Sequence, residues 1–262
     1  MDKKKELFFS ACENGRIEEV SQLLHQLNPN FQDGPTLKRT PFFIACQKGH
    51  TEVVKLLLSD GRVQVNCENN LGRTPFYMAC YYGCIEIVKL LLNDERIDVN
   101  KAEMYGWSPF YMACSNKQIE VVKLLLNDPR IDINRAGKFH RSPAWSICYS
   151  GYFEIMECIL ASEKEINLSR KDDFEKRPID VARERSGEGI DYQELEEEWK
   201  NRQENCAKIV ELLERVERDP FNERFKLRRR YGFLGKSFSY HFLKKILFFF
   251  FSFFSFFSFS SK

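Results

Sequence analysis

Apolar and polar positions alternate along this chain in a pattern that repeats every 34 residues. The segment TPFFIAC returns as TPFYMAC, SPFYMAC and SPAWSIC. The four copies begin at Thr40, Thr74, Ser108 and Ser142. A second apolar segment, EVVKLLL at residues 52–58, recurs with the same spacing. A fixed period of this length is typical of stacked-repeat proteins, and each repeat here contains two apolar segments.

Each repeat is predicted to form two short helices. Thr or Ser before Pro favours a helix start, because the hydroxyl accepts a bond from an unpaired backbone N–H and Pro has none to lose. The first helices are expected to begin at Pro41, Pro75, Pro109 and Pro143. They are expected to end at Gly49, Gly83 and Gly151, where glycine can adopt a left-handed conformation. The second helix has an apolar face too broad for one helix pair to cover, so neighbouring repeats must stack on it.

The T-P-x-x-x-A segment, the Gly between two short helices, the VVKLLL helix and the V-N…G-x-T turn resemble the ankyrin repeat. An N-terminal copy starts at Leu7 and a sixth at Arg177. The resemblance implies an all-α solenoid of about six helix–turn–helix repeats, joined by β-turn or hairpin fingers. The expected repeats span residues 6–38, 39–72, 73–106, 107–140, 141–175 and 176–217.

The chain departs from the family pattern at three places. Aromatic residues replace the usual His after the helix start, so aromatic packing is expected instead of a Thr–His hydrogen bond. These residues are Phe43, Tyr77, Tyr111 and Trp145. The links at residues 93–98 and 127–132 are one residue longer than usual and lack Gly. Lys117 stands where Gly83 stands in the preceding repeat, and a left-handed non-glycine residue costs about 1 kcal/mol.

The distribution of charges and cysteines along the chain indicates which kinds of site and which cellular compartment to expect. Residues 218–262 contain ten Lys or Arg and two Asp or Glu, which leaves residues 1–217 with 30 basic and 36 acidic residues. Five of the nine cysteines share one repeat position, which predicts that they are small buried side chains. These are Cys12, Cys46, Cys80, Cys114 and Cys148. The sequence contains no C-x-x-C pair, so it offers no zinc-site motif. Unpaired thiols, with no secretory signal at the N-terminus, predict an intracellular, cytoplasmic protein.

The sixth repeat differs from the others. After a first helix at Pro178, residues 186–189 form a break, and Asp191 and Glu194 resemble a capping box. Apolar residues then recur at helical spacing to about Arg218, which extends the second helix by about 18 residues, or about 27 Å. This extension is interpreted as a C-terminal cap on the solenoid; the alternative is a partner-binding arm that presents Leu195 and Trp199.

The tail, residues 218–262, is basic and then rich in Phe and Ser. Three interpretations stay open. A spanning helix needs about 17–25 apolar residues, and the run from Ile246 to Phe259 has 14. A membrane-surface segment would combine Phe with the basic residues of 226–236. The third interpretation is a misread gene end, because Phe and Ser share pyrimidine-rich codons.

No catalytic motif and no phosphate-binding loop is found, so we expect no enzyme, no catalytic residue, no cofactor and no metal site. The resemblance implies a protein–protein interaction adapter that binds through the finger tips and the concave face of the first helices. The alternative is a membrane-associated adapter localised by residues 226–259. Nucleic acid is disfavoured by the acidic array, and a monomer is expected.

The partner-binding surface is predicted from aromatic and arginine residues at the finger tips and on the exposed side of the first helices. Those positions are expected to be free of packing roles, and Tyr, Trp and Arg are the types enriched in binding hot spots. The predicted residues are Leu71, Arg73, Tyr81, Tyr82, Met104, Tyr105, Trp107, Phe139, Arg141 and Tyr149.

Overall fold

The computed structural model describes residues 3–187 and 196–232, and this part of the chain is helical, without a β-strand. Its α-helices are α1 (Lys3–Glu13), α2 (Ile17–Leu24), α3 (Pro41–Lys48), α4 (Thr51–Ser59), α5 (Pro75–Tyr82), α6 (Ile85–Leu92), α7 (Pro109–Ser115), α8 (Ile119–Asn127), α9 (Pro143–Ser150), α10 (Phe153–Ala161), α11 (Pro178–Gly187), α12 (Glu196–Arg218) and α13 (Pro220–Arg230). A 3₁₀ turn, η1, spans Lys138–His140. The predicted all-α solenoid of six helix pairs, from α1–α2 to α11–α12, is confirmed.

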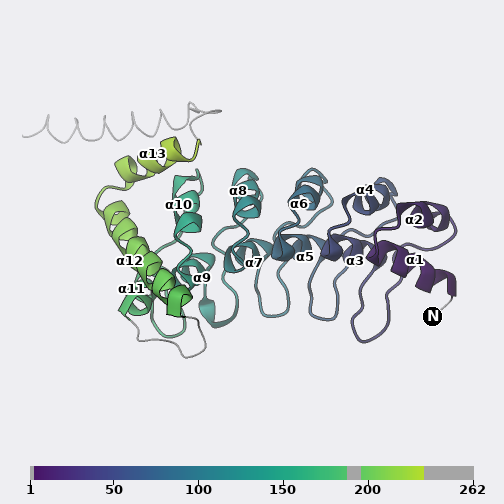
Figure 1. Ribbon diagram of the computed structural model, residues 1–262, viewed down its shortest axis with the longest axis horizontal. Helices are drawn as coiled ribbons and strands as arrows, with labels where there is room; N and C mark the ends of the chain where they lie inside the picture. Colours follow the sequence, from purple (N-terminus) through teal and green to yellow (C-terminus); the bar gives the residue numbers. More distant parts are fainter. Residues whose placement is uncertain (1–2, 188–195, 233–262) are drawn as a thin grey trace, which may run out of the picture.

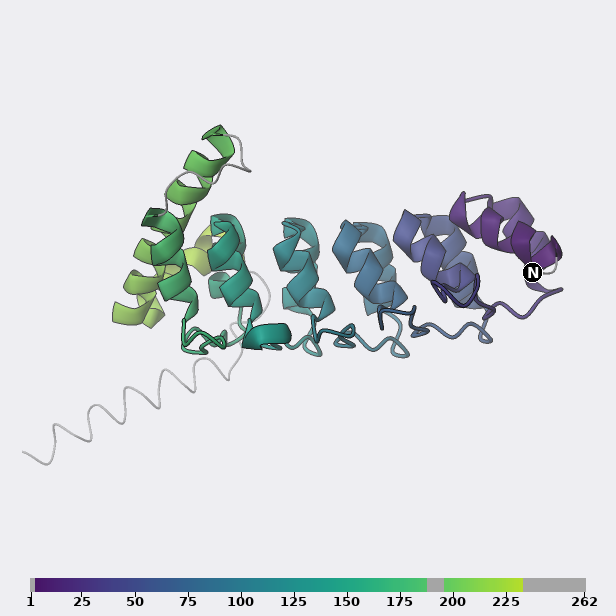
Figure 2. The same ribbon diagram turned by 90° about the horizontal axis from the view of Figure 1, so that it is seen from below.

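The helix pairs lie side by side in one row. The first helices, α1 to α9, form one layer and the second helices, α2 to α10, form another, while the connecting loops extend beyond the first-helix layer (Figure 1). Each first helix contacts the first helix of the next pair, and each second helix from α2 to α8 contacts the next second helix. Figure 2 shows the same row from below, with the loops along one edge.

The first helices begin where the sequence predicts, and the cap geometry gives the reason. Thr40 Oγ1 accepts a hydrogen bond from the backbone N–H of Phe43 at 3.1 Å, and Pro41 occupies the first helical turn. The same bond recurs from Thr74 to Tyr77 and from Ser108 to Tyr111, each at 3.1 Å. Hydroxyl capping before Pro therefore sets the start of α3, α5, α7 and α9.

Left-handed residues end the first helices. Gly49, Gly83 and Gly151 have φ angles of 81°, 72° and 68°. Lys117 adopts the same conformation, with φ at 56°, and so has backbone strain that a glycine would not have. At Gly151 space is limiting as well, because a Cβ atom there would lie 2.9 Å from the carbonyl oxygen of Arg202 in α12.

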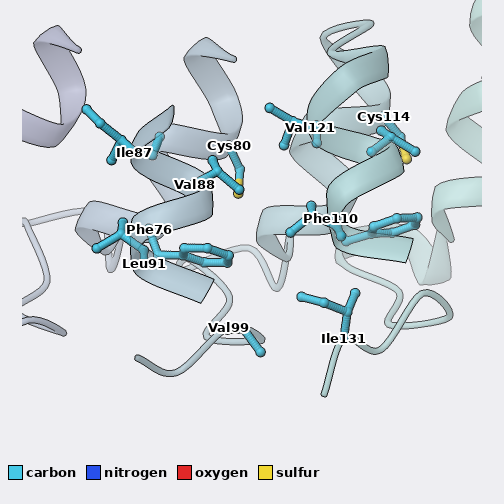
Figure 3. Packing of buried hydrophobic residues seen from close by; sticks show 14 of the residues in the cluster. Phe76, Cys80, Ile87, Val88, Leu91, Val99, Phe110, Cys114, Val121 and Ile131 are labelled. Atoms are coloured by element: carbon cyan, nitrogen blue, oxygen red, sulfur yellow. The ribbon is translucent and has the colours of Figure 1, made fainter. Parts of the chain in front are cut away.

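One continuous apolar core runs through the array. Figure 3 shows equivalent residues of two neighbouring repeats, with Phe76 and Cys80 in one and Phe110 and Cys114 in the next. Leu91 has no exposed surface. The predicted burial of the five periodic cysteines is confirmed. Burial raises the pKa of Cys80 and Cys114 well above the usual thiol range, so these groups stay protonated and apolar.

A row of asparagine side chains ties each repeat to the next. The Nδ2 of Asn66 donates to the carbonyl oxygen of Arg96 at 2.7 Å, and its Oδ1 accepts from the N–H of Asp98 at 3.0 Å. Asn100 makes the same two bonds in the next repeat, at 2.6 and 2.8 Å. The complete row is Asn30, Asn66, Asn100 and Asn134. Each amide therefore satisfies one backbone donor and one backbone acceptor of the following repeat.

The long glycine-free links end the second helices in a different way. Asp94 accepts hydrogen bonds from the backbone and the guanidinium of Arg96, and these bonds lower the pKa of its carboxyl group. The Nη2 of Arg96 also donates to the carbonyl oxygen of Leu58, in the preceding repeat, at 3.2 Å. Arg62 and Arg130 make the equivalent bonds to Leu24 and Leu92, at 2.8 and 2.6 Å. The arginine thus caps the C-terminus of the preceding second helix.

The sixth pair closes the array. The first helix starts at Pro178, as predicted, and α12 buries Cys206, Ile209 and Leu213 at the predicted helical spacing. Helix α12 packs against α9, α10 and α11, which supports the cap interpretation. The proposed capping box at residues 191–194 and the arm residue Leu195 lie outside the described residues.

Beyond Arg218, where the sequence analysis begins the tail, the chain forms α13 and packs against α10 and α12. The Nε of Arg224 donates to the carbonyl oxygen of Leu160 at 3.0 Å, and its Nη2 donates to those of Ser162 and Lys164 at 2.9 Å. Leu160 follows Leu92 by two repeat periods. Arg224 therefore caps α10 in the way that Arg62, Arg96 and Arg130 cap α2, α4 and α6.

A buried acid fixes the end of α13. Glu157 is only 4% exposed, and its carboxylate accepts hydrogen bonds from Arg230 at 2.7 Å and from the hydroxyl of Tyr231 at 2.8 Å. Leu227 is buried on the same side of the helix. Residues 220–231 are thus part of the folded array.

Removing Leu91 tests the core. We expect Leu91→Ala to lower the free energy of unfolding by about 2–5 kcal/mol, because it leaves a cavity in a fully buried site. Urea denaturation followed by circular dichroism measures the change. Lys89→Ala, on the exposed side of the same helix, is the control and should change stability by less than about 0.5 kcal/mol. A loss below about 1 kcal/mol for Leu91→Ala would contradict the interior position of this face.

Removing Arg224 tests the C-terminal cap. Arg224→Ala removes the charged donor of the Leu160 and Lys164 carbonyl groups, while the Ser162 carbonyl keeps a bond from Arg228, so we expect a loss of about 2–3 kcal/mol. Amide hydrogen exchange should rise first in α10 and α12, because repeats couple mainly to their neighbours. Arg229→Ala, on the exposed side of α13, is the matched control. Equal exchange rates in the two variants would show that Arg224 does not hold the cap.

Candidate protein-binding face

Five closed loops, which we call the fingers, connect the helix pairs. In each, the backbone N–H of the first residue donates to the carbonyl oxygen of the last, as from Glu103 to Trp107 at 3.1 Å. The fingers are residues 33–39, 69–73, 103–107, 137–141 and 172–176. In the third finger the buried carboxylate of Glu103 also accepts from the N–H groups of Tyr105 and Trp107, at 2.8 and 3.3 Å. These internal bonds hold each finger in one conformation.

Backbone hydrogen bonds also join neighbouring fingers at their tips. The N–H of Met104 donates to the carbonyl oxygen of Leu71 at 3.0 Å, and the N–H of Lys138 donates to that of Tyr105 at 2.8 Å. The four acceptors, 34 residues apart in the sequence, are Leu37, Leu71, Tyr105 and Phe139. The tips therefore form a connected row in which equivalent side chains are repeated from finger to finger.

Large apolar side chains at this row are open to solvent. Met104 is 58% exposed, Tyr105 49% and Phe139 41%. Two residues at the ends of the first helices, Tyr82 and Tyr149, are exposed as well. Five of the predicted residues are therefore exposed: three on the finger tips, and two at the C-terminal ends of α5 and α9.

Beneath this surface arginine and aromatic side chains form a packed layer. The guanidinium of Arg141 lies 4.0 Å from the ring centre of Trp145 and 5.3 Å from that of Phe139. Trp145 stacks on Tyr149 with ring centres 5.0 Å apart, and its Nε1 donates to the buried carboxylate of Asp172 at 3.0 Å. Such contacts fix the orientation of Phe139 and Tyr149 before any partner is bound.

The expectation that all ten positions are free of packing roles is wrong for Arg73, Trp107 and Arg141. Trp107 stacks on Tyr111 with ring centres 4.2 Å apart and lies against Gly137, where a Cβ atom would be 2.3 Å from the indole. Arg73 and Arg141 lie over the rings of Tyr77 and Trp145. These three residues support the surface from within.

The other two predicted residues are half-buried. Leu71 uses its N–H to bond the Oδ1 of Asn69 at 2.9 Å. Tyr81 packs against the buried group of Phe43, Tyr77 and Met78. Both positions contribute an edge to the face, with most of their surface in internal contacts.

Two tip residues were missed by the sequence analysis. Leu37 is 43% exposed and stands 34 residues before Leu71. Phe174 is 62% exposed, the largest value among the exposed large hydrophobic residues of residues 3–187 and 196–232. The repeat spacing alone could have found Leu37. Phe174 is harder to find, because the fifth link is one residue longer.

The positive charge of Lys138 lies close to two exposed aromatic rings of the face. The ammonium of Lys138 lies 5.4 Å from the ring centre of Tyr105 and 4.9 Å from that of Phe139. The Nδ1 of His140 is hydrogen-bonded to the carboxylate of Asp173 in the next finger. The fourth finger is therefore cationic between two exposed aromatic residues, a combination suited to a partner with apolar and acidic groups.

The described residues show no feature of a metal site or of an acid–base site. Within the residues that the structure describes, no three His, Cys, Asp or Glu side chains are grouped in a way that could hold a metal ion. Burial raises the pKa of the Tyr77 and Tyr111 hydroxyls, so both stay neutral. Over residues 3–187 and 196–232, no helix combines the length and the apolar character that crossing a bilayer requires.

Stacked helix pairs with closed fingers and an apolar row define a helical repeat protein. Comparison with known families gives the same answer: residues 8–103 match the model for ankyrin repeats in three copies, and residues 105–135 match that for a single ankyrin repeat. The chain is an ankyrin repeat-containing protein. No curated protein matches it. Ankyrin repeats are in general protein–protein interaction modules and typically lack enzymatic activity.

Proposed function

We propose that this protein is a non-enzymatic adapter that binds another protein through its finger tips and the concave face of the first helices. The observation that carries the proposal is the connected row of exposed side chains at Met104, Tyr105 and Phe139, with Tyr82 and Tyr149 exposed at the C-terminal ends of the first helices α5 and α9. Monomeric proteins rarely expose contiguous apolar patches without a binding role.

The packed layer beneath the row also favours binding. Interfaces gain affinity when the contacting side chains are already oriented, because less conformational entropy is lost on association. Here Phe139 is held between Lys138 and Arg141, and Tyr149 is held by Trp145 and Arg185. Rigid aromatic side chains of this kind are the usual anchors of protein interfaces.

Crosslinking from the face tests the proposal. A photoreactive phenylalanine analogue placed at Tyr105 or at Phe139 should capture the same protein in cells, because both positions are exposed on adjacent tips. The analogue at Lys55, on the exposed side of α4, is the control and should not capture that protein. The captured protein, once purified, should bind the Tyr105→Ser/Phe139→Ser variant more weakly by 2 kcal/mol or more, about thirtyfold.

The double variant should keep its fold. Both side chains are about half exposed, so its free energy of unfolding should change by less than about 1.5 kcal/mol. Trp107 is unsuitable for this test, because its removal also disrupts the contact with Tyr111. Undiminished binding by the folded double variant would contradict the proposed face.

A second candidate function is a membrane-associated adapter held by residues 226–259. The observation that favours it is the charge of the C-terminal sequence: residues 224–262 contain nine Lys or Arg and no Asp or Glu. Cationic segments with aromatic residues associate with anionic lipid surfaces.

Cell fractionation tests the second candidate. The full chain should appear in the membrane pellet, and a chain ending at Gly232, which keeps all of α13, should be shifted toward the soluble fraction. The pellet should release part of the full chain in high salt, because screening weakens attraction to anionic lipid. An unchanged distribution of the two chains would rule out residues 233–262 as a membrane determinant.

A further inference from the structure

The outward side of α13 differs from every other surface of the second-helix layer. The helix docks on the array through Arg224, Leu227 and Tyr231. At about 100° per residue, Phe221, Phe225 and Arg229 follow one another on the opposite side, and Asn222 and Lys226 lie next to them.

Two aromatic rings dominate this side. Phe221 is 51% exposed and Phe225 37%, and their rings stack with centres 6.5 Å apart. Among the described residues, the other exposed large hydrophobic side chains lie on the fingers or the first helices: Leu7, Leu37, Tyr82, Met104, Tyr105, Phe139, Tyr149 and Phe174. The phenylalanine pair is thus a separate apolar site on the far side of the molecule.

The charge around the pair is positive. Arg229 is exposed, and the side chain of Lys226 is 70% exposed. The nearest acid, Glu223, is shared between Lys226 at 2.7 Å and Arg215 at 3.4 Å, so it balances only one of the two cations. Asp219 is engaged by Asn222 at the start of the helix. No acidic residue follows Glu223 in the sequence.

We propose that the outward side of α13 is a contact site for an anionic lipid bilayer surface. Phe221 and Phe225 enter the boundary between headgroups and acyl chains, and Lys226 and Arg229 face the lipid phosphates and carboxylates. The proposal deepens the second candidate function and rests on it; it is independent of the finger face.

The position of α13 makes this contact compatible with partner binding. Figure 1 shows α13 beyond the second-helix layer and the loops beyond the first-helix layer, on opposite sides of the molecule. A bilayer against α13 leaves the finger tips directed toward the aqueous phase. The array would then present its binding face at a fixed distance from the membrane.

Vesicle binding by the full chain tests the site. The probes are vesicles of phosphatidylcholine with about 30% phosphatidylserine and vesicles of phosphatidylcholine alone, measured by co-sedimentation. We expect Phe221→Ser/Phe225→Ser and Lys226→Glu/Arg229→Glu each to reduce the partition coefficient on the anionic vesicles by about tenfold or more. The charge variant should have little effect on neutral vesicles.

Matched controls replace equally exposed residues elsewhere. Met104→Ser/Phe174→Ser controls for the loss of apolar surface, and Lys55→Glu/Lys89→Glu controls for the change of charge; both should bind as the native chain does. Thermal melts verify folding. A further measurement keeps an aromatic side chain at this position. Brominated lipids should quench the tryptophan fluorescence of the Phe221→Trp variant more strongly than that of the native chain.

Three outcomes would overturn the proposal. The first is native binding by both α13 variants, which would assign the membrane contact to another part of the chain, such as the sequence after Gly232. The second is no added quenching in Phe221→Trp. The third is binding of polyglutamate by the native chain that is lost in the α13 variants while vesicle binding is unchanged, which would identify an acidic polypeptide site. If the full chain binds no vesicle at all, the second candidate function fails as well.

Discussion

A pair of eight-residue helices cannot cover its own apolar face, and the rest of this structure depends on that constraint. Val88 and Leu91 are buried because α4 and α8 flank α6 and because the first helices lie beneath it. Each repeat is stable only with neighbours, so the row needs an end at which stacking can stop. Helices α12 and α13 provide it, and the asparagine bridges and arginine caps hold the intermediate repeats at a constant spacing.

The two surfaces proposed to bind follow from the same constraint. The stack leaves the finger tips out of the core, so apolar side chains there, such as Met104 and Phe139, are available for contact. The layer that supports them is made of side chains with internal contacts, so the half-buried Trp107 and Arg141 pack on Tyr111 and Trp145 as well as adjoining the face. At the other side, α13 is held by its polar and apolar inner residues, and its aromatic outer residues remain on the surface.

The parts of the fold that could be predicted from the sequence are those set by residues close together in the chain. The starts of α3, α5, α7 and α9 are determined by Thr or Ser before Pro, and three of these helices end at Gly, so these first helices and the repeat period follow from the sequence. The docking of α13 does not, because Arg224 bonds carbonyl groups some 60 residues earlier in the chain. The packing of Trp107 was missed for the same reason: its room is created by Gly137, in the next finger. The repeat period shows which positions are equivalent between repeats, but it does not show which side chains of neighbouring repeats pack on one another.

The arginine that caps α10 also imposes an order on biosynthesis. Helices α2, α4 and α6 are capped by arginines that follow 38 residues after the capped leucine, whereas Arg224 follows Leu160 by 64 residues. At about 5–20 residues per second, a ribosome needs roughly 3–13 seconds to make that stretch. During this interval the N-terminal repeats can already stack while the end of α10 stays hydrated. The nascent chain therefore folds from its N-terminus toward its C-terminus. The contacts of Glu157 with Arg230 and Tyr231 form last.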